Sequence, residues 1–600
     1  MSRDSTRKRK APARYSEEEY EIDQQDEETW GVFSFQMPVS SDEEMSGNEY
    51  EEEDEEEERS SVWSPGLHEH RSRSPATTAA GVASVNRSQT QDAWKTEDDP
   101  DTANPGPPTF LPKRTPGVQP PLTTGKQTPG AIFSQFFDAE VLKILCENTN
   151  SFAQKKKETG KPFPWKDLTP QELTKYLGLL LYMSVCNFPR ITDYWRKNSI
   201  FHVSYPAAVM SRDRFLTISS HLHFSDPDVD AVNEQKMGTE EYDPLQRVRC
   251  LLEMISSRCK AAYHPRQHIS VGERMVATKG RLQIKEHVDA DKPTKWGLNF
   301  FVLADVNGYT IDYMLHSGEK QRASGKGLAF DVVAELVNRE YLGSGYIVYC
   351  DSFYTSPVLF RHLIQQGFGA CGMYKQGRTG VPTTKLNALN RKSKRGSIRW
   401  IRDGDLLYLR WMDTREMSLC TTVHPVHGGE TIVRWQKTED GRSQRAPLPR
   451  PTAVSEFNKY MGGVDTSGQM LTTNSVHRKT RRWDVTVFQH LLDIAVTNSY
   501  IIQKELSSAL EQKPLSRQDF QEQLCAELLG VPLAEPPQTT GDGHFPCPTS
   551  KGRDIETSQR ASKGRKQCYF CKRSTPWMCE KCGIGLCLQL DRNCFKIYHT

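Results

Sequence analysis

The chain has 600 residues, enough for roughly three or four domains, and its net charge of +2 hides a strongly acidic run at residues 49–58 and a basic run at residues 7–10. We predict no membrane span, because no stretch of about 18 apolar residues occurs, and no secretory signal, because no apolar segment follows the N-terminal charges. Of the 15 cysteines, six fall within residues 568–594. This clustering favours reduced thiols and a metal site, in a cytosolic or nuclear protein, over a disulfide framework.

Residues 1–130 are predicted to form a disordered tail. They combine acidic runs, Ser-Pro pairs and a proline-rich stretch at residues 105–121, and their apolar residues are too sparse to offset the entropy lost on ordering. The basic run at residues 7–10 fits a nuclear import signal, with an ordinary charged tail as the alternative. We therefore expect a nuclear protein whose folded part begins near Ile132.

A helical domain is predicted over residues 131–268. Apolar residues recur at helical spacing in several windows of this segment. One window opens with Thr169-Pro170-Gln171-Glu172, which has the form of a capping box with proline at the first helical position. The four predicted helices cover residues 133–147, 169–185, 211–222 and 242–263.

The pattern changes to strands at His268. A first strand is predicted over residues 268–271, and two apolar runs, at residues 296–303 and 309–314, then flank the turn signal Asn307-Gly308. A helix is predicted over residues 327–341, and a buried strand then ends at Asp351. Three strands in a meander, a helix and a fourth strand parallel to the first indicate an α/β fold with an RNase H-like core. The carboxyl end of a strand is a common place for a metal ligand, although such an aspartate is more often a turn or cap residue.

The remaining segments alternate between insertion, core and linker. Residues 373–455 are basic and then alternate as strands do, which indicates a β-rich insertion. A helix is predicted over residues 483–504 and a short one over 516–529. The predicted domains are a tail (1–130), a helical domain (131–268), a core in two parts (269–372 and 456–504), an insertion (373–455), a linker (505–567) and a Cys-rich domain (568–600).

Several motifs occur in an order that points to one family. They are KGRL at residues 279–282, YCDSFYTSP at 349–357, CGMYKQGRTGVP at 371–382, YMGGVD at 460–465, NSY at 498–500 and the final YHT at 598–600. This ordered set resembles the piggyBac family of DNA transposases, including the vertebrate piggyBac-derived proteins. The resemblance covers about residues 130–504 and 568–600.

The resemblance implies a specific chemistry. In the family, three aspartates of an RNase H-like core bind two divalent metal ions that cleave DNA strands. Asp351 matches the second position and Asp465 the third, but Gly272 stands at the first, followed by Glu273 where the family also has Glu. Glycine offers no oxygen ligand, so we expect strand cleavage to be lost or severely reduced. The alternative is that Glu273 substitutes as a ligand and keeps a Mg²⁺ site active, which requires a local bulge because adjacent strand residues face opposite ways.

The C-terminal cysteines have the spacing of zinc ligands. Two CxxC pairs are followed by two further cysteines and a histidine, and close thiolates repel unless a metal neutralises them. The seven candidate ligands are Cys568, Cys571, Cys579, Cys582, Cys587, Cys594 and His599. Two tetrahedral sites need an eighth, for which Cys547, His544 and Asp591 are candidates, unless one site is incomplete. The layout resembles a cross-brace zinc finger and the family's own terminal Cys-rich domain.

Two groups of basic residues are predicted to bind DNA through its phosphates. The first follows the third catalytic position and comprises Arg478, Lys479, Arg481 and Arg482. The second flanks the zinc ligands and comprises Lys563, Arg565, Lys566, Lys572 and Arg573. A further basic stretch lies in the insertion at residues 391–399. Solvated basic loops are the alternative for each group.

Three functions are compatible with these features. The first is a domesticated piggyBac-derived nuclear DNA-binding protein with a degenerate catalytic site, structural zinc and, as the family implies, a homodimeric state. Its DNA target would include piggyBac-type terminal repeats. The second is an active transposase or nuclease that uses Glu273. The third is a zinc-finger interaction or ubiquitin-ligase protein, against which the transposase-like core argues.

Overall fold

The computed structural model describes residues 93–101, 106–120, 122, 128–159, 164–279, 286–287, 296–318, 324–437, 443–478, 480–532, 544–550, 559, 563–589 and 591–599. The acidic run at residues 49–58, the basic run at residues 7–10, Lys479 and most of the KGRL motif lie outside the described residues.

The folded part begins earlier than the sequence predicts. Trp94 is buried and its indole nitrogen donates to the Thr384 carbonyl over 3.0 Å. Strand β1 (Leu111–Pro112) pairs with β8 (Gly343–Ser344), and β2 (Gly117–Val118) pairs with β3 (Tyr263–His264). The predicted disorder through residue 130 is therefore wrong for residues 106–120 and for the segment around Trp94. A few anchoring residues and backbone pairs supply contacts that a composition count does not detect.

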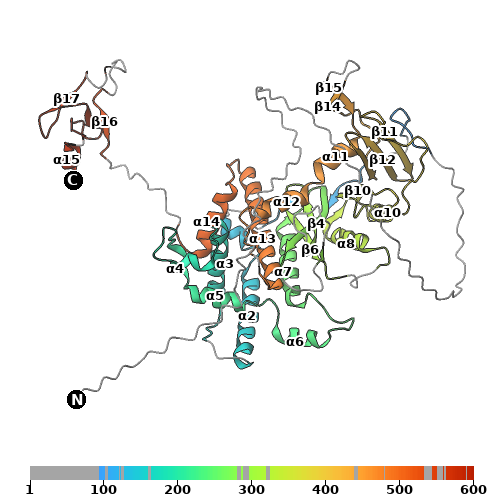
Figure 1. Ribbon diagram of the computed structural model, residues 1–600, viewed down its shortest axis with the longest axis horizontal. Helices are drawn as coiled ribbons and strands as arrows, with labels where there is room; N and C mark the ends of the chain where they lie inside the picture. Colours follow the sequence, from blue (N-terminus) through green and yellow to red (C-terminus); the bar gives the residue numbers. More distant parts are fainter. Residues whose placement is uncertain are drawn as a thin grey trace, which may run out of the picture. The chain divides into compact units, whose positions relative to one another are not determined.

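Helices build the segment from residue 129 to 262. They are α1 (Pro129–Phe133), α2 (Ala139–Thr159), α3 (Pro170–Val185), the 3-10 helix η2 (Ile191–Trp195), α4 (Tyr205–Val209), α5 (Arg212–His221), α6 (Pro227–Gln235) and α7 (Gln246–Ala262). Two helices from the end of the core join them: α13 (Trp483–Ala509) packs beside α7, and α14 (Arg517–Leu529) packs beside α3 (Figure 1). Chain segments distant in sequence thus share one helical core.

Two details differ from the predicted helices. The helix expected over residues 133–147 is two helices, because Asp138 accepts from the Val141 backbone N–H over 2.9 Å and so caps a new helix, α2. Thr169 caps α3 as expected, by accepting from the Glu172 N–H over 3.3 Å. The Glu172 side chain, however, does not complete a capping box, since it pairs with Arg214.

A mixed sheet of nine strands forms the centre of the core, in the order β11-β12-β13-β10-β9-β4-β6-β5, with β7 also paired to β6. Its strands are β4 (His268–Ala277), β5 (Glu286–His287), β6 (Trp296–Asp305), β7 (Thr310–Leu315), β9 (Ile347–Cys350), β10 (Gly369–Met373), β11 (Ile398–Asp403), β12 (Leu406–Met412) and β13 (Glu416–Thr421). The predicted meander is confirmed, because β4, β6 and β7 pair antiparallel and β9 lies parallel to β4.

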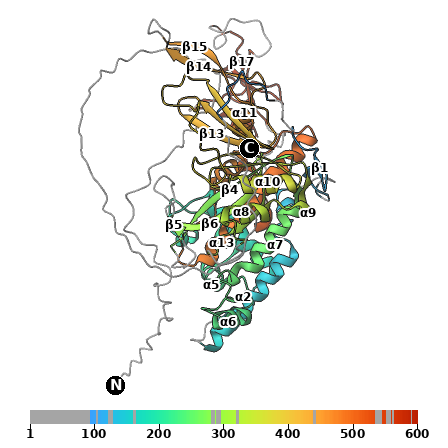
Figure 2. The same cartoon turned by 90° about the vertical axis from the view of Figure 1, so that its right-hand side faces the viewer.

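Helices cover both faces of this sheet. On one face lie α11 (Thr452–Tyr460), α12 (Gly463–Thr472) and α13, and the ring of Phe300 in β6 packs 4.7 Å from His490 of α13. On the other lie α8 (Leu328–Leu336) and α10 (Pro357–Gln365), which lie beside β4 and β6 in Figure 2. The ring of Phe301 packs near Tyr354 on this face. Alternate residues of each central strand therefore face different layers.

The helix predicted over residues 327–341 is also divided. α8 ends at Leu336, and the short α9 (Arg339–Leu342) restarts after Asn338, whose side chain accepts from the Glu340 N–H over 2.7 Å. An asparagine inside an apolar run thus acts as a helix cap rather than as a surface position.

The strands predicted within residues 373–455 continue the central sheet. β13 pairs antiparallel with β10, so β11, β12 and β13 extend the core sheet at one edge. A separate hairpin follows, formed by β14 (Thr431–Lys437) and β15 (Ser443–Pro449). The edge strand β11 is tied to the early segment by an ion pair of 2.6 Å between Arg402 and Asp101.

The C-terminal module, residues 544–599, has its own small core. It contains β16 (Pro546–Pro548), β17 (Lys566–Gln567), β18 (Ser574–Thr575), β19 (Trp577–Cys579) and α15 (Cys594–His599). The buried residues of this core are mostly cysteines. Within the described residues, none of the helices is long and apolar enough to cross a membrane.

Candidate functional site

The three positions that match the family's catalytic residues converge at one place in the fold. The parallel register of β4 and β9 pairs Val271 with Cys350, so the next residues along the two strands are Gly272 and Asp351. α12 packs across β4: a Cβ atom at position 272 would lie 3.2 Å from a methyl carbon of Val464. Asp465 follows Val464 in the first turn of that helix. We call Gly272, Asp351 and Asp465 the carboxylate edge.

Both aspartates of this edge are accessible. Asp351 is partly exposed and directs one carboxylate oxygen to the Phe353 N–H at 2.8 Å, which shapes the turn after β9. Asp465 is exposed. The sequence predicted the strand that carries Asp351, but it did not indicate that Asp465 lies on a helix.

Glu273 faces the opposite side of the sheet. The β4–β6 register runs without a shift from Ile269 to Ala277, so no bulge turns Glu273 toward α12. It pairs with Phe301, whose ring packs near Tyr354. Burial, followed by the charges of Glu273 and Asp351, raises the pKa of Tyr354. Glu273 thus belongs to the α8 and α10 face, and α12 with Asp465 packs on the other.

Arg274 is a further residue of this site that the sequence did not single out. It shares the α12 face of β4 with Gly272, and its guanidinium donates to the Ser467 hydroxyl over 2.8 Å. Only the strand alternation, continued two residues beyond Gly272, could have drawn attention to it.

The C-terminal module brings eight potential zinc ligands into two sets of four. Within each set the ligand atoms lie within 4.8 Å of one another. The first set is Cys568, Cys571, Cys587 and Cys594, and the second is His544, Cys579, Cys582 and His599. The sets interleave along the chain, as in a cross-brace. Tetrahedral Cys and His sets are the usual ligands of structural Zn²⁺, so these residues fit that ion.

His544 is the eighth candidate ligand, because it completes the second set. Its Nδ1 lies 3.0 Å from the Cys582 sulfur and 3.3 Å from the Cys579 sulfur. Cys547 and Asp591, the other candidates, belong to neither set. Spacing could not choose among them, because His544 lies far upstream of the other ligands, on the preceding segment.

Two of the four basic residues before α13 are occupied inside the fold. Arg478 donates to the Tyr194 hydroxyl over 3.0 Å, and its guanidinium lies over that ring. Arg482 donates to the Leu222 carbonyl at the end of α5 and pairs with Asp484. Arg481 is exposed. The first basic group therefore contributes to packing more than the sequence predicts.

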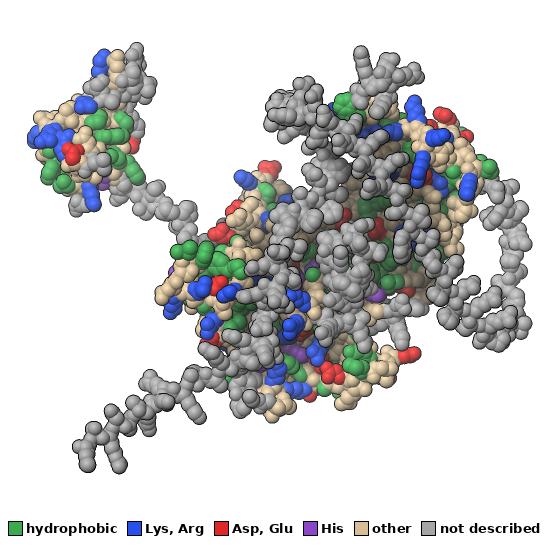
Figure 3. All heavy atoms as spheres, viewed as in Figure 1, with side chains coloured by type: hydrophobic (Ala, Val, Ile, Leu, Met, Phe, Trp, Pro, Cys, Tyr) green, Lys and Arg blue, Asp and Glu red, His purple; other side chains and the backbone are tan. Residues whose placement is uncertain are grey.

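The basic residues of the C-terminal module are mostly exposed. Lys563, Arg565, Lys572 and Arg573 are accessible, and Lys566 is partly so. Blue and green side chains lie side by side on the visible face of this module, labelled β16, β17 and α15 in Figure 1 (Figure 3). The exposed aromatic rings among the described residues of this module are Phe545, Tyr569, Phe570 and Tyr598. Cations with adjacent aromatic rings are the side chains that contact phosphates and stacked bases.

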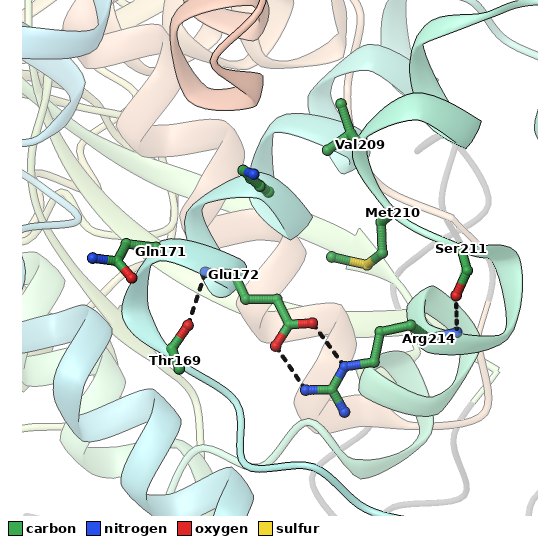
Figure 4. A pocket seen from close by; sticks show the side chains of 8 residues that line it. Thr169, Gln171, Glu172, Val209, Met210, Ser211 and Arg214 are labelled. Carbon is green, nitrogen blue, oxygen red and sulfur yellow. Dashed lines mark hydrogen bonds and ion pairs between the residues drawn. The ribbon is translucent and has the colours of Figure 1, made fainter.

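A cavity of about 400 Å³ lies between the start of α3 and the start of α5. Figure 4 shows Glu172 and Arg214 joined in it by two hydrogen bonds of 2.7 and 2.8 Å. Thr169 and Ser211 cap the two helices from its rim. Because Glu172 and Arg214 pair and Thr169 and Ser211 cap helices, we interpret the cavity as a helix junction.

Comparisons with known proteins identify a family and several similar chains. A family model described as Transposase IS4 matches residues 128–500. The human PiggyBac transposable element-derived protein 3 is 23% identical over 495 residues, which cover 80% of this chain and 77% of that protein. The human PiggyBac transposable element-derived protein 5 is 25% identical over 436 residues, 69% of this chain and 78% of that protein.

A solved structure has a similar fold. It is the cryo-EM structure of the piggyBac transposase synaptic complex with hairpin DNA, with a TM-score of 0.58 and 21% identity over 79% of this chain and 99% of that one. The chain therefore belongs to the piggyBac transposase family.

Proposed function

We propose that this protein is a domesticated piggyBac-derived nuclear DNA-binding protein whose RNase H-like core no longer cleaves DNA strands. The proposal for the core rests on the strand order β7-β6-β4-β9-β10, which has three antiparallel strands followed by two parallel ones. Nuclear location and a homodimeric state are carried over from the family as part of the same proposal.

The glycine at the carboxylate edge is the observation that carries the proposal. Mg²⁺ requires oxygen ligands in near-octahedral geometry, and position 272 supplies none. Glu273 does not replace the missing ligand, because it lies on the opposite face of an unshifted strand pair. The two remaining aspartates thus do not fit a site for two Mg²⁺ ions.

DNA binding is supported by the C-terminal module. Bound zinc would cross-link the module's segments and fix their conformation, with each ion held by one set of four ligands. Around it, Lys563, Lys572 and Arg573 present exposed charges. The solved structure that this chain resembles is a transposase complex with hairpin DNA, and for this reason we propose duplex DNA as the partner.

The experiment separates binding from cleavage on one substrate. Purified full-length protein is mixed with duplex DNA carrying piggyBac-type terminal repeats, with Mg²⁺ or Mn²⁺, and both complex formation and nicked or hairpin products are measured. We expect a complex and no products. If products form, the same assay with Glu273→Gln and with Asp351→Asn tests which carboxylate the cleavage requires.

Two results would contradict the proposal. Products that disappear in the Asp351→Asn variant would show an active metal site, and loss in Glu273→Gln would assign the missing ligand to Glu273. Failure to bind any duplex DNA, in protein with both zinc sets filled, would remove the DNA-binding function.

A further inference from the structure

A face built to bind divalent cations would not carry a fixed positive charge. Arg274 nevertheless lies on the face of β4 that carries Gly272. It is two residues beyond Gly272 on the same face of β4, directed at α12. The Ser467 hydroxyl that it contacts is fully buried and shares a hydrogen bond of 2.9 Å with Thr310 of β7. The arginine is therefore built into the packing between α12 and the sheet.

The guanidinium is only partly satisfied. Its Nε and Nη1 atoms are buried and have no hydrogen-bond partner among the described residues. Burial lowers the pKa of Arg274 to about 10, while the charge of Asp465 acts in the opposite direction. The side chain consequently remains positive at neutral pH, with Asp465 as the carboxylate that stabilises the charge.

The neighbouring titratable groups add no second positive charge. Burial, then the charge of Arg274 itself, lowers the pKa of His490 on α13 far below its usual range. Burial also lowers the pKa of His477, which precedes that helix. Both imidazoles are thus neutral at pH 7. Of these three buried basic groups, only Arg274 carries a positive charge at pH 7, and Asp465 is the carboxylate whose charge acts on it.

We propose that Arg274 has taken over the electrostatic role of the metal at the carboxylate edge. Its charge offsets Asp465, so the face folds without a divalent ion, and the same charge repels any such ion from Asp351 and Asp465. This inference rests on the proposed loss of the metal site and goes beyond it: restoring a carboxylate at position 272 alone does not restore metal binding.

The test measures Mn²⁺ binding by the loss of the free-ion electron paramagnetic resonance signal. Full-length, zinc-loaded protein is compared as wild type, Gly272→Asp, Gly272→Asp with Arg274→Gln, and Gly272→Asp with Arg274→Lys. Each of these proteins is also measured with Asp351→Asn added, and only the Mn²⁺ binding that this substitution abolishes is counted. Weak binding by the acidic run at residues 49–58 is thereby excluded. Lysine keeps the charge and is the matched control for glutamine.

We expect no Asp351-dependent binding in the wild type. Removing the charge in the Arg274→Gln double variant should strengthen binding by about tenfold or more over Gly272→Asp alone, because a unit charge a few ångströms from a divalent ion opposes it strongly. The Arg274→Lys double variant should resemble Gly272→Asp. If Gly272→Asp misfolds, the same series is made with Val464→Ala, which clears space for the new side chain.

The two proposals fail in different ways. Equal Mn²⁺ affinity of Gly272→Asp and its Arg274→Gln double variant, at any level, would overturn the role of Arg274 and leave the proposed function intact. Asp351-dependent binding in the wild type would overturn the proposed function itself.

Discussion

The C-terminal module and the carboxylate edge differ in how well their side chains fit a metal ion. In the C-terminal module, eight side chains from several short segments lie within ligand distance in two complete sets. At the carboxylate edge, the backbone still brings three family positions together, but one of them is Gly272 and an arginine shares its face. On the function that we propose, the fold keeps the framework of a metal site without one of its ligands, because packing between α12 and β4 stabilises that framework.

The largest effect is expected in the C-terminal module. Structural zinc contributes about 10 kcal/mol or more to the folding of small domains, so Cys579→Ser should unfold much of the module.

His544→Ala should lower the zinc content from two ions to one, as measured by metal release with a chromogenic chelator. Cys547→Ser is the control and should retain both ions. A full zinc content in His544→Ala would refute our assignment of the eighth ligand.

The second prediction distinguishes packing arginines from DNA-binding ones. Arg482→Ala leaves Asp484 as an unpaired buried charge, which should lower the free energy of unfolding by about 3 kcal/mol. Its exposed neighbour Arg481 serves as the matched control, because Arg481→Ala should leave stability unchanged. Thermal unfolding measures both variants. Equal stability of the two would contradict the internal role of Arg482.

The same comparison extends to the C-terminal module. Arg573→Ala should leave thermal unfolding unchanged. It should reduce the slope of the logarithm of the DNA-binding constant against the logarithm of the salt concentration by about one, which corresponds to the loss of one phosphate contact. An unchanged salt slope would remove Arg573 from the DNA contacts.

Acid should weaken the core sheet through two neighbouring histidines. Burial is the main reason that the pKa of His268 and of His424 is lowered to about 4, below the ordinary 6.5. Because the folded-state pKa is depressed, stability present above pH 6.5 is lost as the pH falls toward 4. For the buried His424 the loss is at most about 3 kcal/mol. His424→Gln should flatten this acid limb of the unfolding curve, and the exposed His202→Gln should not.

The smallest effect concerns the fit between Gly272 and Val464. A side chain at position 272 brings its Cβ to 3.2 Å from Val464, so Gly272→Ala should cost about 1 kcal/mol. Adding Val464→Ala should recover part of that loss relative to Val464→Ala alone. Urea unfolding measures the coupling, and purely additive effects would show that the two residues do not constrain each other.

The sequence predicted the strands and the cysteines better than the details that complete the sites. Apolar runs and the turn signal Asn307-Gly308 indicated β4, β6 and β7, because strand composition and turn chemistry are local properties. Three features depend on tertiary contacts instead. They are the helix that carries Asp465, the division of the predicted helix 327–341 at Asn338, and the burial of Trp94. His544 was one of three candidates that spacing could not separate, and Arg274 was missed, because each acquires its role only when distant segments meet.

The most direct test of the central claim is a count of metal ions on the two regions at once. Full-length protein is saturated with Zn²⁺ and Mn²⁺, passed through a desalting column and analysed by inductively coupled plasma mass spectrometry. We predict two zinc ions per chain and no manganese that depends on Asp351. Stoichiometric manganese that disappears in Asp351→Asn would contradict the account, because the carboxylate edge would then hold metal despite Gly272.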